Sequence, residues 1–122
     1  MATIQRFEDI ESWKTARQLT RAVYELSRQG EFAKDFGLRD QMRRAAVSVM
    51  SNIAEGFESR TRSLFAEYLG RAKASCGELR AQAYVALDAN YIQQQFETLV
   101  NMCISCSKQI HAFITYLKTK PE

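Results

Sequence analysis

The sequence predicts an all-α protein, an antiparallel up-and-down four-helix bundle. Four segments carry apolar residues at the three- and four-residue spacing that gives a helix one apolar face. Only one of the 122 residues is Pro and 46% are apolar, a composition that favours long helices over sheet. The connections between the segments are short, which places consecutive helices antiparallel to one another. We therefore expect a single domain over residues 1–122.

The first helix is expected to begin near Asp9 and to end at Gly30. Basic residues gather on its outer side, within an arc of roughly 60° when each residue advances by about 100°. They are Lys14, Arg17, Arg21 and Arg28. Such a stripe is either an ordinary solvated face or a surface that follows nucleic-acid phosphates.

The connection from Glu31 to Gly37 contains Phe32 and Phe36, which we expect to plug one end of the bundle. The second helix is predicted from Leu38 to Phe57, with Gly56 free to adopt the left-handed conformation that ends a helix. Asn52 borders its main apolar face and is expected to find a hydrogen-bond partner inside.

The second helix also carries a second apolar strip and an arginine cluster. Val47, Met50 and Ala54 make a strip that is too apolar for a helix that only covers a monomer core. The cluster, close to the start of the helix, comprises Arg39, Arg43 and Arg44. It could bind phosphate, or it could pair with Asp35, with Asp40 or with a carboxylate of a neighbouring subunit.

The third helix is predicted from a cap at Ser59, Thr61 or Ser63 to about Asp88. It is rich in small residues, and Gly70 and Gly77 lie in its interior. An interior Gly costs about 0.8–1 kcal/mol relative to Ala, a cost that close approach of another backbone would explain. We expect that neighbour either within the bundle or across a subunit interface.

Asn90 is predicted to break the third helix, and Tyr91 leads into the fourth, which Pro121 prevents from continuing. The fourth helix has a heptad pattern: Ile92, Phe96, Leu99, Cys103, Cys106, Ile110, Phe113 and Leu117. Val100, Ile104 and Ile114 widen this stripe to about half the circumference, more than the arc of about 100° that usually faces a core. The fourth helix is therefore expected to be central or buried from two sides.

The run SNIAEGF, residues 51–57, together with the preceding DQMRRAAVSV, resembles the signature of the 23S rRNA intervening-sequence proteins. The segments FEDIESWKTARQL, FGLRDQMRRAA and SLFAEYLGRAKASCGELRAQ extend the resemblance over roughly residues 7–90. It implies a four-helix bundle that assembles into a closed cyclic ring, a pentamer. It implies no reaction.

Side chains suited to catalysis do not converge in this sequence. His111 is the only histidine, and no phosphate-binding glycine loop is present. Cys103 and Cys106 form a CxxC inside an apolar-periodic helix, where small core residues are the favoured reading over a zinc site lacking further ligands. Glu55 and Glu78 are expected to pair with arginines across helices or subunits. We predict a non-enzyme with no catalytic residues, metal, cofactor or small-molecule substrate.

The sequence contains no apolar run long enough to cross a bilayer and no secretion signal, so we expect a cytoplasmic protein without membrane contact. The three cysteines make an odd count, which argues against disulfide stapling. The formal charge of +3 permits contact with nucleic acid without requiring it.

Two function classes follow. The first is an oligomeric, nucleic-acid-associated accessory protein that binds RNA or DNA backbones through the basic stripe and the arginine cluster. The second is a structural or scaffolding oligomer with no nucleic-acid ligand. In both, the predicted subunit interface comprises Val47, Met50, Ala54, Gly70, Ala74, Gly77 and Ile104, because exposing all of this apolar and small-residue surface would exceed what a monomer normally shows.

Overall fold

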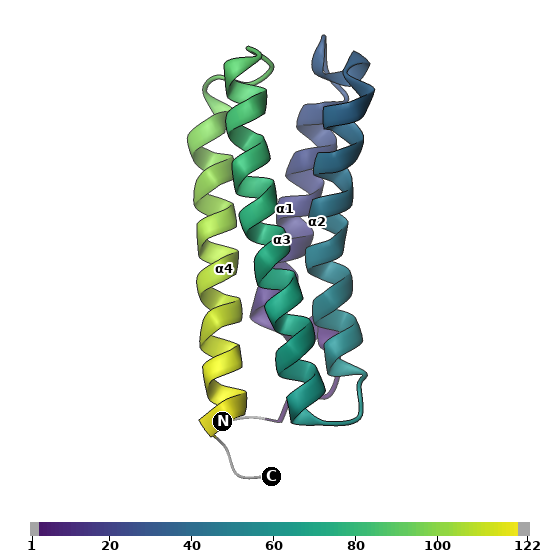
Figure 1. Cartoon of the computed structure of the whole chain (residues 1–122), viewed down its shortest axis with the longest axis vertical. Coiled ribbons are helices and arrows are strands. Elements are labelled where there is room, and N and C mark those ends of the chain that lie inside the picture. The colour runs from purple at the N-terminus through teal and green to yellow at the C-terminus, as the bar shows by residue number, and fades with distance from the viewer. Residues whose placement is uncertain (1–2, 120–122) are drawn as a thin grey trace.

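The computed structural model describes residues 3–119 and confirms the four-helix bundle (Figure 1). The helices are α1 (Glu11–Ser27), α2 (Phe36–Phe57), α3 (Arg62–Asp88) and α4 (Gln95–Thr119). Two short 3₁₀ turns, η1 (Phe7–Asp9) and η2 (Phe32–Lys34), precede α1 and α2. The helices run alternately up and down, and each packs against two neighbours, α2 between α1 and α3, and α4 between α3 and α1. No helix within residues 3–119 combines the length and apolarity that a membrane crossing needs.

Capping side chains set the helix starts. The Asp35 carboxylate accepts a hydrogen bond from the Leu38 backbone N–H at 3.1 Å, so α2 begins at Phe36, two residues before the predicted start. Thr61 is the cap of α3, accepting from the Leu64 N–H at 3.1 Å, as one of the three predicted candidates. The α3 helix ends at Asp88, and Asn90, two residues later, has a positive φ of 65°.

The ends of the first and fourth helices differ slightly from prediction. The region near Asp9 forms η1, and Ile10 is extended, so α1 starts at Glu11 and ends at Ser27, before Gly30. The α4 helix starts only at Gln95, although Ile92 in the preceding turn is buried as the heptad predicts. Pro121 lies outside the described residues.

The core consists of two clusters stacked along the bundle axis. The upper cluster, at the end in Figure 1 where α1 joins α2 and α3 joins α4, is centred on Leu19, Val23, Met42, Leu79, Leu99 and Cys103. The lower cluster is centred on Ala16, Val49, Ile53, Leu69, Cys106 and Ile110. All four helices contribute to both clusters, as the apolar spacings predict.

Aromatic residues close the upper end only in part as expected. Phe32 is 2% exposed and stacks on Tyr91, with ring centroids 5.2 Å apart. The Tyr91 hydroxyl donates to the Asp35 carboxylate at 2.9 Å and so ties the α3–α4 turn to the α1–α2 connection. The prediction for Phe36 is wrong: it is 63% exposed, because its position on α2 turns it away from the axis.

The close helix approach occurs at Gly56, not at the predicted glycines. Gly56 stays inside α2 without a left-handed φ, and a Cβ there would lie 2.8 Å from Phe65 Cδ1 and 2.8 Å from Tyr68 Cβ of α3. A Cβ at Gly70 or Gly77 would meet nothing within 4 Å, because both face outward. The expected close neighbour within the bundle is therefore absent at these two glycines.

Small polar residues also join α2 to α3. The Asn52 amide has the hydrogen-bond partner that the sequence predicted, but on its own helix: it donates to the Ser48 carbonyl at 2.9 Å and to Ser48 Oγ at 3.0 Å. Ser48 Oγ in turn lies 3.0 Å from Ser75 Oγ of α3. The α2–α3 seam thus combines a glycine contact at its lower end with a hydroxyl contact further up.

Candidate nucleic-acid interface

The basic stripe of α1 is exposed, and its members differ in their partners. Lys14 lies 3.5 Å from Glu11, and Arg28 lies 3.5 Å from Glu25, both as exposed pairs along the helix. Pairs of this kind contribute little to stability and exchange readily with solvent. Arg17 lies over the Trp13 ring at 5.9 Å. Among the described residues neither Arg17 nor Arg21 has an ion pair.

Two adjoining hollows lie between α1 and α2. The larger, about 430 Å³, is lined by Arg17, Thr20, Arg21, Tyr24, Glu25, Arg28 and Met50. The second, about 390 Å³, is lined by Tyr24, Asp40, Arg43, Arg44 and Val47. Tyr24 lines both, so the two form one surface, which we call the α1–α2 groove. The groove joins the stripe of the first helix to two of the three arginines of the second.

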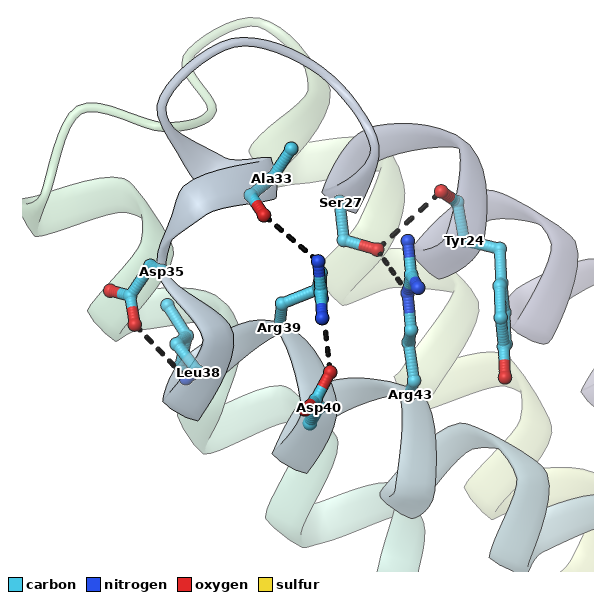
Figure 2. Close-up of polar contacts among 8 residues, drawn as sticks. All are labelled: Tyr24, Ser27, Ala33, Asp35, Leu38, Arg39, Asp40 and Arg43. Atoms are coloured by element: carbon cyan, nitrogen blue, oxygen red, sulfur yellow. Dashed lines mark hydrogen bonds and ion pairs between the residues drawn. The ribbon is translucent and has the colours of Figure 1, made fainter.

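Two arginines of the cluster are held by contacts inside the chain (Figure 2). Arg43 Nε donates to Ser27 Oγ at 2.8 Å, and its guanidinium lies 4.6 Å from the centroid of the Tyr24 ring. Arg39 Nε donates to Asp40 at 2.9 Å, and its Nη1 donates to the Ala33 carbonyl at 2.9 Å. Both guanidiniums therefore fix the connection between α1 and α2 in addition to supplying charge.

Arg44 differs from these two because it is exposed and makes no ion pair among the described residues. Of the predicted carboxylate partners, Asp40 is taken by Arg39, and Asp35 accepts from Leu38 and Tyr91. The cluster thus divides into two anchored arginines, Arg39 and Arg43, and one free one. Within residues 3–119, the cations of the groove without a carboxylate partner are Arg17, Arg21, Arg43 and Arg44.

The residues predicted for a subunit interface fall on three separate surfaces. Val47 is 40% exposed and, like the partly buried Met50, lines the α1–α2 groove. Gly70, Ala74 and Gly77 are exposed on the outer face of α3. Ile104 is partly buried and packs against the upper core cluster of its own chain, and Ala54 is also partly buried. Val47 and Met50 therefore share a surface with the arginines.

The cysteines belong to the core. Cys76, Cys103 and Cys106 are all buried and unpaired. The hydrogen bond between Cys76 and Cys106, together with burial, raises the pKa of the Cys76 thiol, and burial raises the pKa of Cys103 to about 12. Both thiols are therefore protonated at neutral pH and unreactive. Within residues 3–119 no group of three or more His, Cys, Asp or Glu side chains is placed to hold a metal ion.

The remaining candidates for special roles lie on the surface. His111 is exposed, with its Nδ1 3.3 Å from the Lys73 ammonium nitrogen of α3. Glu55 and Glu78 are also exposed, and in the described part of the chain neither makes the expected ion pair with an arginine. These side chains do not converge, so the structure offers no arrangement of acid, base and nucleophile around them.

Two aromatic residues of this region were not predicted to belong to the site. Tyr24 lies between the two hollows, and its position follows from the spacing of three and four residues that separates it from Arg21 and Arg28. Phe36 lies seven residues before Arg43 and so projects from the same side of α2. The helical spacing could have identified Tyr24, but the exposure of Phe36 depends on where the α1–α2 connection turns.

Comparisons with known proteins give the fold from a solved structure and the family from a family model. The chain is similar to a solved protein of unknown function from the S23 ribosomal protein family of Bacteroides thetaiotaomicron. The TM-score is 0.79 at 19% identity, over 85% of this chain and 95% of the other, a likeness that shows the fold alone. No curated protein matches the chain. The family model of the 23S rRNA-intervening sequence protein matches residues 8–112, and with most of its length covered the chain belongs to that family.

Proposed function

We propose that the protein is a non-enzymatic, nucleic-acid-associated accessory protein that binds RNA or DNA phosphates along the α1–α2 groove. The observation that carries the proposal is that Arg17, Arg21, Arg43 and Arg44 line one hollowed surface and have no carboxylate partner among the described residues. Guanidiniums suit this task because their planar N–H groups match phosphate oxygens. Tyr24 adds a hydroxyl group to the same surface.

The anchoring of Arg43 supports phosphate binding. A side chain already fixed by Ser27 Oγ and by the Tyr24 ring loses less conformational freedom when it meets a ligand. Arg44, by contrast, is exposed, and its side chain can adjust to the position of a nucleic-acid backbone. The acids that line the groove, Glu25 and Asp40, pair with Arg28 and Arg39 respectively. They therefore neutralise those two cations, and the other four arginines have no carboxylate partner among the described residues.

We further propose a homo-oligomer, a closed pentameric ring, in which the outer face of α3 supplies subunit contact. Gly70, Ala74 and Gly77 give this face a flat surface, and Tyr84 and Val85 beside them are 49% and 53% exposed. Val47 and Met50 are assigned to the nucleic-acid surface instead, since they line the groove. Five copies of a chain with charge +3 carry 5 × 3 = +15, so symmetry would multiply a modest charge.

A salt titration tests nucleic-acid binding. Binding to unrelated RNA and duplex DNA should be tolerant of sequence and fall steeply with salt through counterion release. The double variant Arg17→Ala/Arg21→Ala should weaken binding to all sequences and reduce the slope of log K against log salt by about 2, one for each lost phosphate contact. Helicity should be unchanged, because both side chains are exposed.

The matched control is Lys108→Ala/Lys118→Ala, which removes the same charge from exposed positions on α4. The control should keep most of the wild-type affinity and slope if the groove is the site. Equal losses in the two double variants would show that net charge alone attracts the nucleic acid. Absence of binding by the wild type at low salt would reject the proposal.

A structural or scaffolding oligomer without a nucleic-acid ligand is the second candidate. It is favoured by the carboxylate partners of Lys14, Arg28 and Arg39, which show that part of the basic surface is engaged within the chain. The same titration distinguishes the candidates. A scaffold should keep its oligomeric mass by light scattering and bind neither RNA nor DNA at low salt.

A further inference from the structure

Phe36 is the most exposed of the large apolar side chains in the described chain, at 63%. It is the first residue of α2, at the upper end of the bundle. Phe32, the other aromatic of the same connection, is 2% exposed and closes the core. The exposure of Phe36 therefore serves no packing need of this chain.

Arg39 holds the Phe36 ring from one side. Its guanidinium carbon lies 4.7 Å from the ring centroid, and its nitrogens are fixed by Asp40 and by the Ala33 carbonyl, each at 2.9 Å. The Arg39 side chain is only 25% exposed, so it is part of the structure rather than a loose surface group. Because Arg39 covers one face of the ring, the exposed area of Phe36 lies on the opposite face and at the edges.

Gly37, the residue after Phe36, lies in open space. A Cβ at Gly37 would meet a single neighbouring atom within 4 Å, Asp35 Oδ1 at 3.8 Å. The residue that follows the ring along the chain thus adds no side chain to cover it. Phe36 therefore presents a flat aromatic surface, oriented by an arginine and open to a planar partner.

The ring lies in line with the groove. Phe36 precedes Arg43 by seven residues and Val47 by eleven, which places all three on one side of α2, with Phe36 about 11 Å along the axis from Arg43. Arg43 and Val47 line the α1–α2 groove, and Arg44 follows next to them. A backbone that follows the arginines toward the upper end of the bundle reaches the Phe36 ring.

We propose that Phe36 and Arg39 form a stacking site for an unpaired nucleobase at the upper end of the α1–α2 groove. This inference rests on the proposed function and defines its ligand as RNA or DNA that presents an unpaired base beside the bound backbone. Every base has a π-face, so the site selects unpaired over paired nucleotides without reading sequence. A base inside a continuous duplex is already stacked on both sides and cannot use it.

The experiment compares two RNAs with the same number of phosphates, a hairpin with 2-aminopurine in its unpaired loop and a fully paired duplex. Phe36→Ala should weaken binding to the hairpin by about 5- to 150-fold, the loss expected from removing one aromatic stacking partner. Binding to the duplex and the salt slope for both RNAs should be unchanged, because no cation is removed.

Two substitutions at the same position separate stacking from general apolar contact. Phe36→Trp keeps an aromatic face and should retain hairpin binding and the quenching of 2-aminopurine fluorescence on binding. Phe36→Leu keeps apolar bulk without a π-face and should lose both. The control is Tyr68→Ala, which removes another aromatic ring that lies beside an arginine, with the Arg71 guanidinium 5.0 Å from the ring centroid. Tyr68 lies on α3 outside the groove, so this variant should leave both RNAs bound as by the wild type.

Several results would overturn this inference. The first is that Phe36→Ala binds the hairpin as tightly as the wild type does. The second is that Phe36→Ala loses equal affinity for the hairpin and the duplex. The third is that its oligomeric mass by light scattering falls, which would show that Phe36 contacts a second copy. If the wild type binds both RNAs with a steep salt slope while Phe36→Ala behaves as wild type, the stacking site fails and the proposed function stands. If the wild type binds neither RNA, both fail.

Discussion

The α1–α2 face and the outer face of α3 differ in how their residues are held. On the α1–α2 face, Arg43 is anchored by Ser27 and Tyr24 from the neighbouring helix. On the outer face of α3, Gly70 and Gly77 have open space where a side chain would lie. A charged residue can therefore be a structural element, while a glycine that disfavours helix can lie in open space. The contacts of each side chain, rather than its type, decide its role.

Gly56, Gly70 and Gly77 also differ in their contacts. Gly56 lies where α2 meets α3, and no side chain fits there without movement of Phe65 or Tyr68. Gly70 and Gly77 lie on the opposite side of α3, away from every helix of their own chain. The same residue type thus marks a tight seam in one place and an open surface in the other, and substitution can tell the two apart.

Gly56→Ala should have the largest effect on stability. The new Cβ would lie 2.8 Å from two atoms of α3, so the helices must shift, which typically costs about 1–3 kcal/mol. The gain in helix propensity, about 1 kcal/mol, offsets only part of this cost. Urea denaturation measures the loss in the free energy of unfolding. A variant as stable as the wild type would show that the seam can open without penalty.

Arg43→Ala and Arg44→Ala test whether one arginine is structural and its neighbour is not. Arg43→Ala removes the hydrogen bond to Ser27 Oγ and the contact with the Tyr24 ring, and it should lower the free energy of unfolding by about 1–2 kcal/mol. Arg44→Ala should change it by less than about 0.5 kcal/mol, as exposed substitutions do. Denaturant midpoints of the two variants, measured side by side, give the answer. Equal losses would remove the distinction drawn between them.

Gly77→Ala on the outer face of α3 should stabilise the isolated bundle by about 0.8–1 kcal/mol, because Ala favours helix and the Cβ meets nothing within 4 Å. Thermal unfolding in parallel with light scattering measures stability and assembly together. In the proposed ring the added methyl group also interferes with subunit contact, so the oligomeric mass should fall. An unchanged mass would remove Gly77 from the proposed interface.

Tyr91→Phe should have the smallest effect, confined to pH values at which the phenol is protonated. The hydrogen bond to the Asp35 carboxylate raises the pKa of Tyr91 above its ordinary value of 10.0. Stability from this contact is therefore complete below pH 10.0 and is lost as the pH rises through the raised pKa. The gap in melting temperature between wild type and variant should be constant from neutral pH to pH 10.0 and close above it. A constant gap at higher pH would assign the difference to packing alone.

The sequence was sufficient for the fold because the core obeys helical spacing. Leu19, Val23, Val49 and Ile53 are buried as their positions require. The pattern does not determine the separation between helices, so the close contact was assigned to Gly70 and Gly77 instead of Gly56. That separation depends on which side chains of the partner helix face the glycine, and a single-helix pattern carries no such information.

The candidate site was predictable as a set of cations but not as a surface. The stripe on α1 follows from the spacing of Arg17, Arg21 and Arg28 alone. Whether the surface continues onto α2 depends on how α1 and α2 are rotated relative to each other, which a sequence pattern does not give. The same rotation places Val47 in the groove. Phe36 was misplaced because the cap at Asp35 starts the helix early and turns the ring outward.

The stacking of two core clusters along the axis bears on how the bundle opens. All four helices pass through both clusters, so neither half can unfold as a separate domain. The two ends nevertheless resist local opening to different degrees, because the Tyr91–Asp35 hydrogen bond joins the two connections at the upper end. Amide hydrogen exchange should therefore be slowest where the clusters meet and should rise more steeply toward the end where α2 turns into α3. The bundle would then open locally from its lower end, while the end with the arginine cluster stays folded.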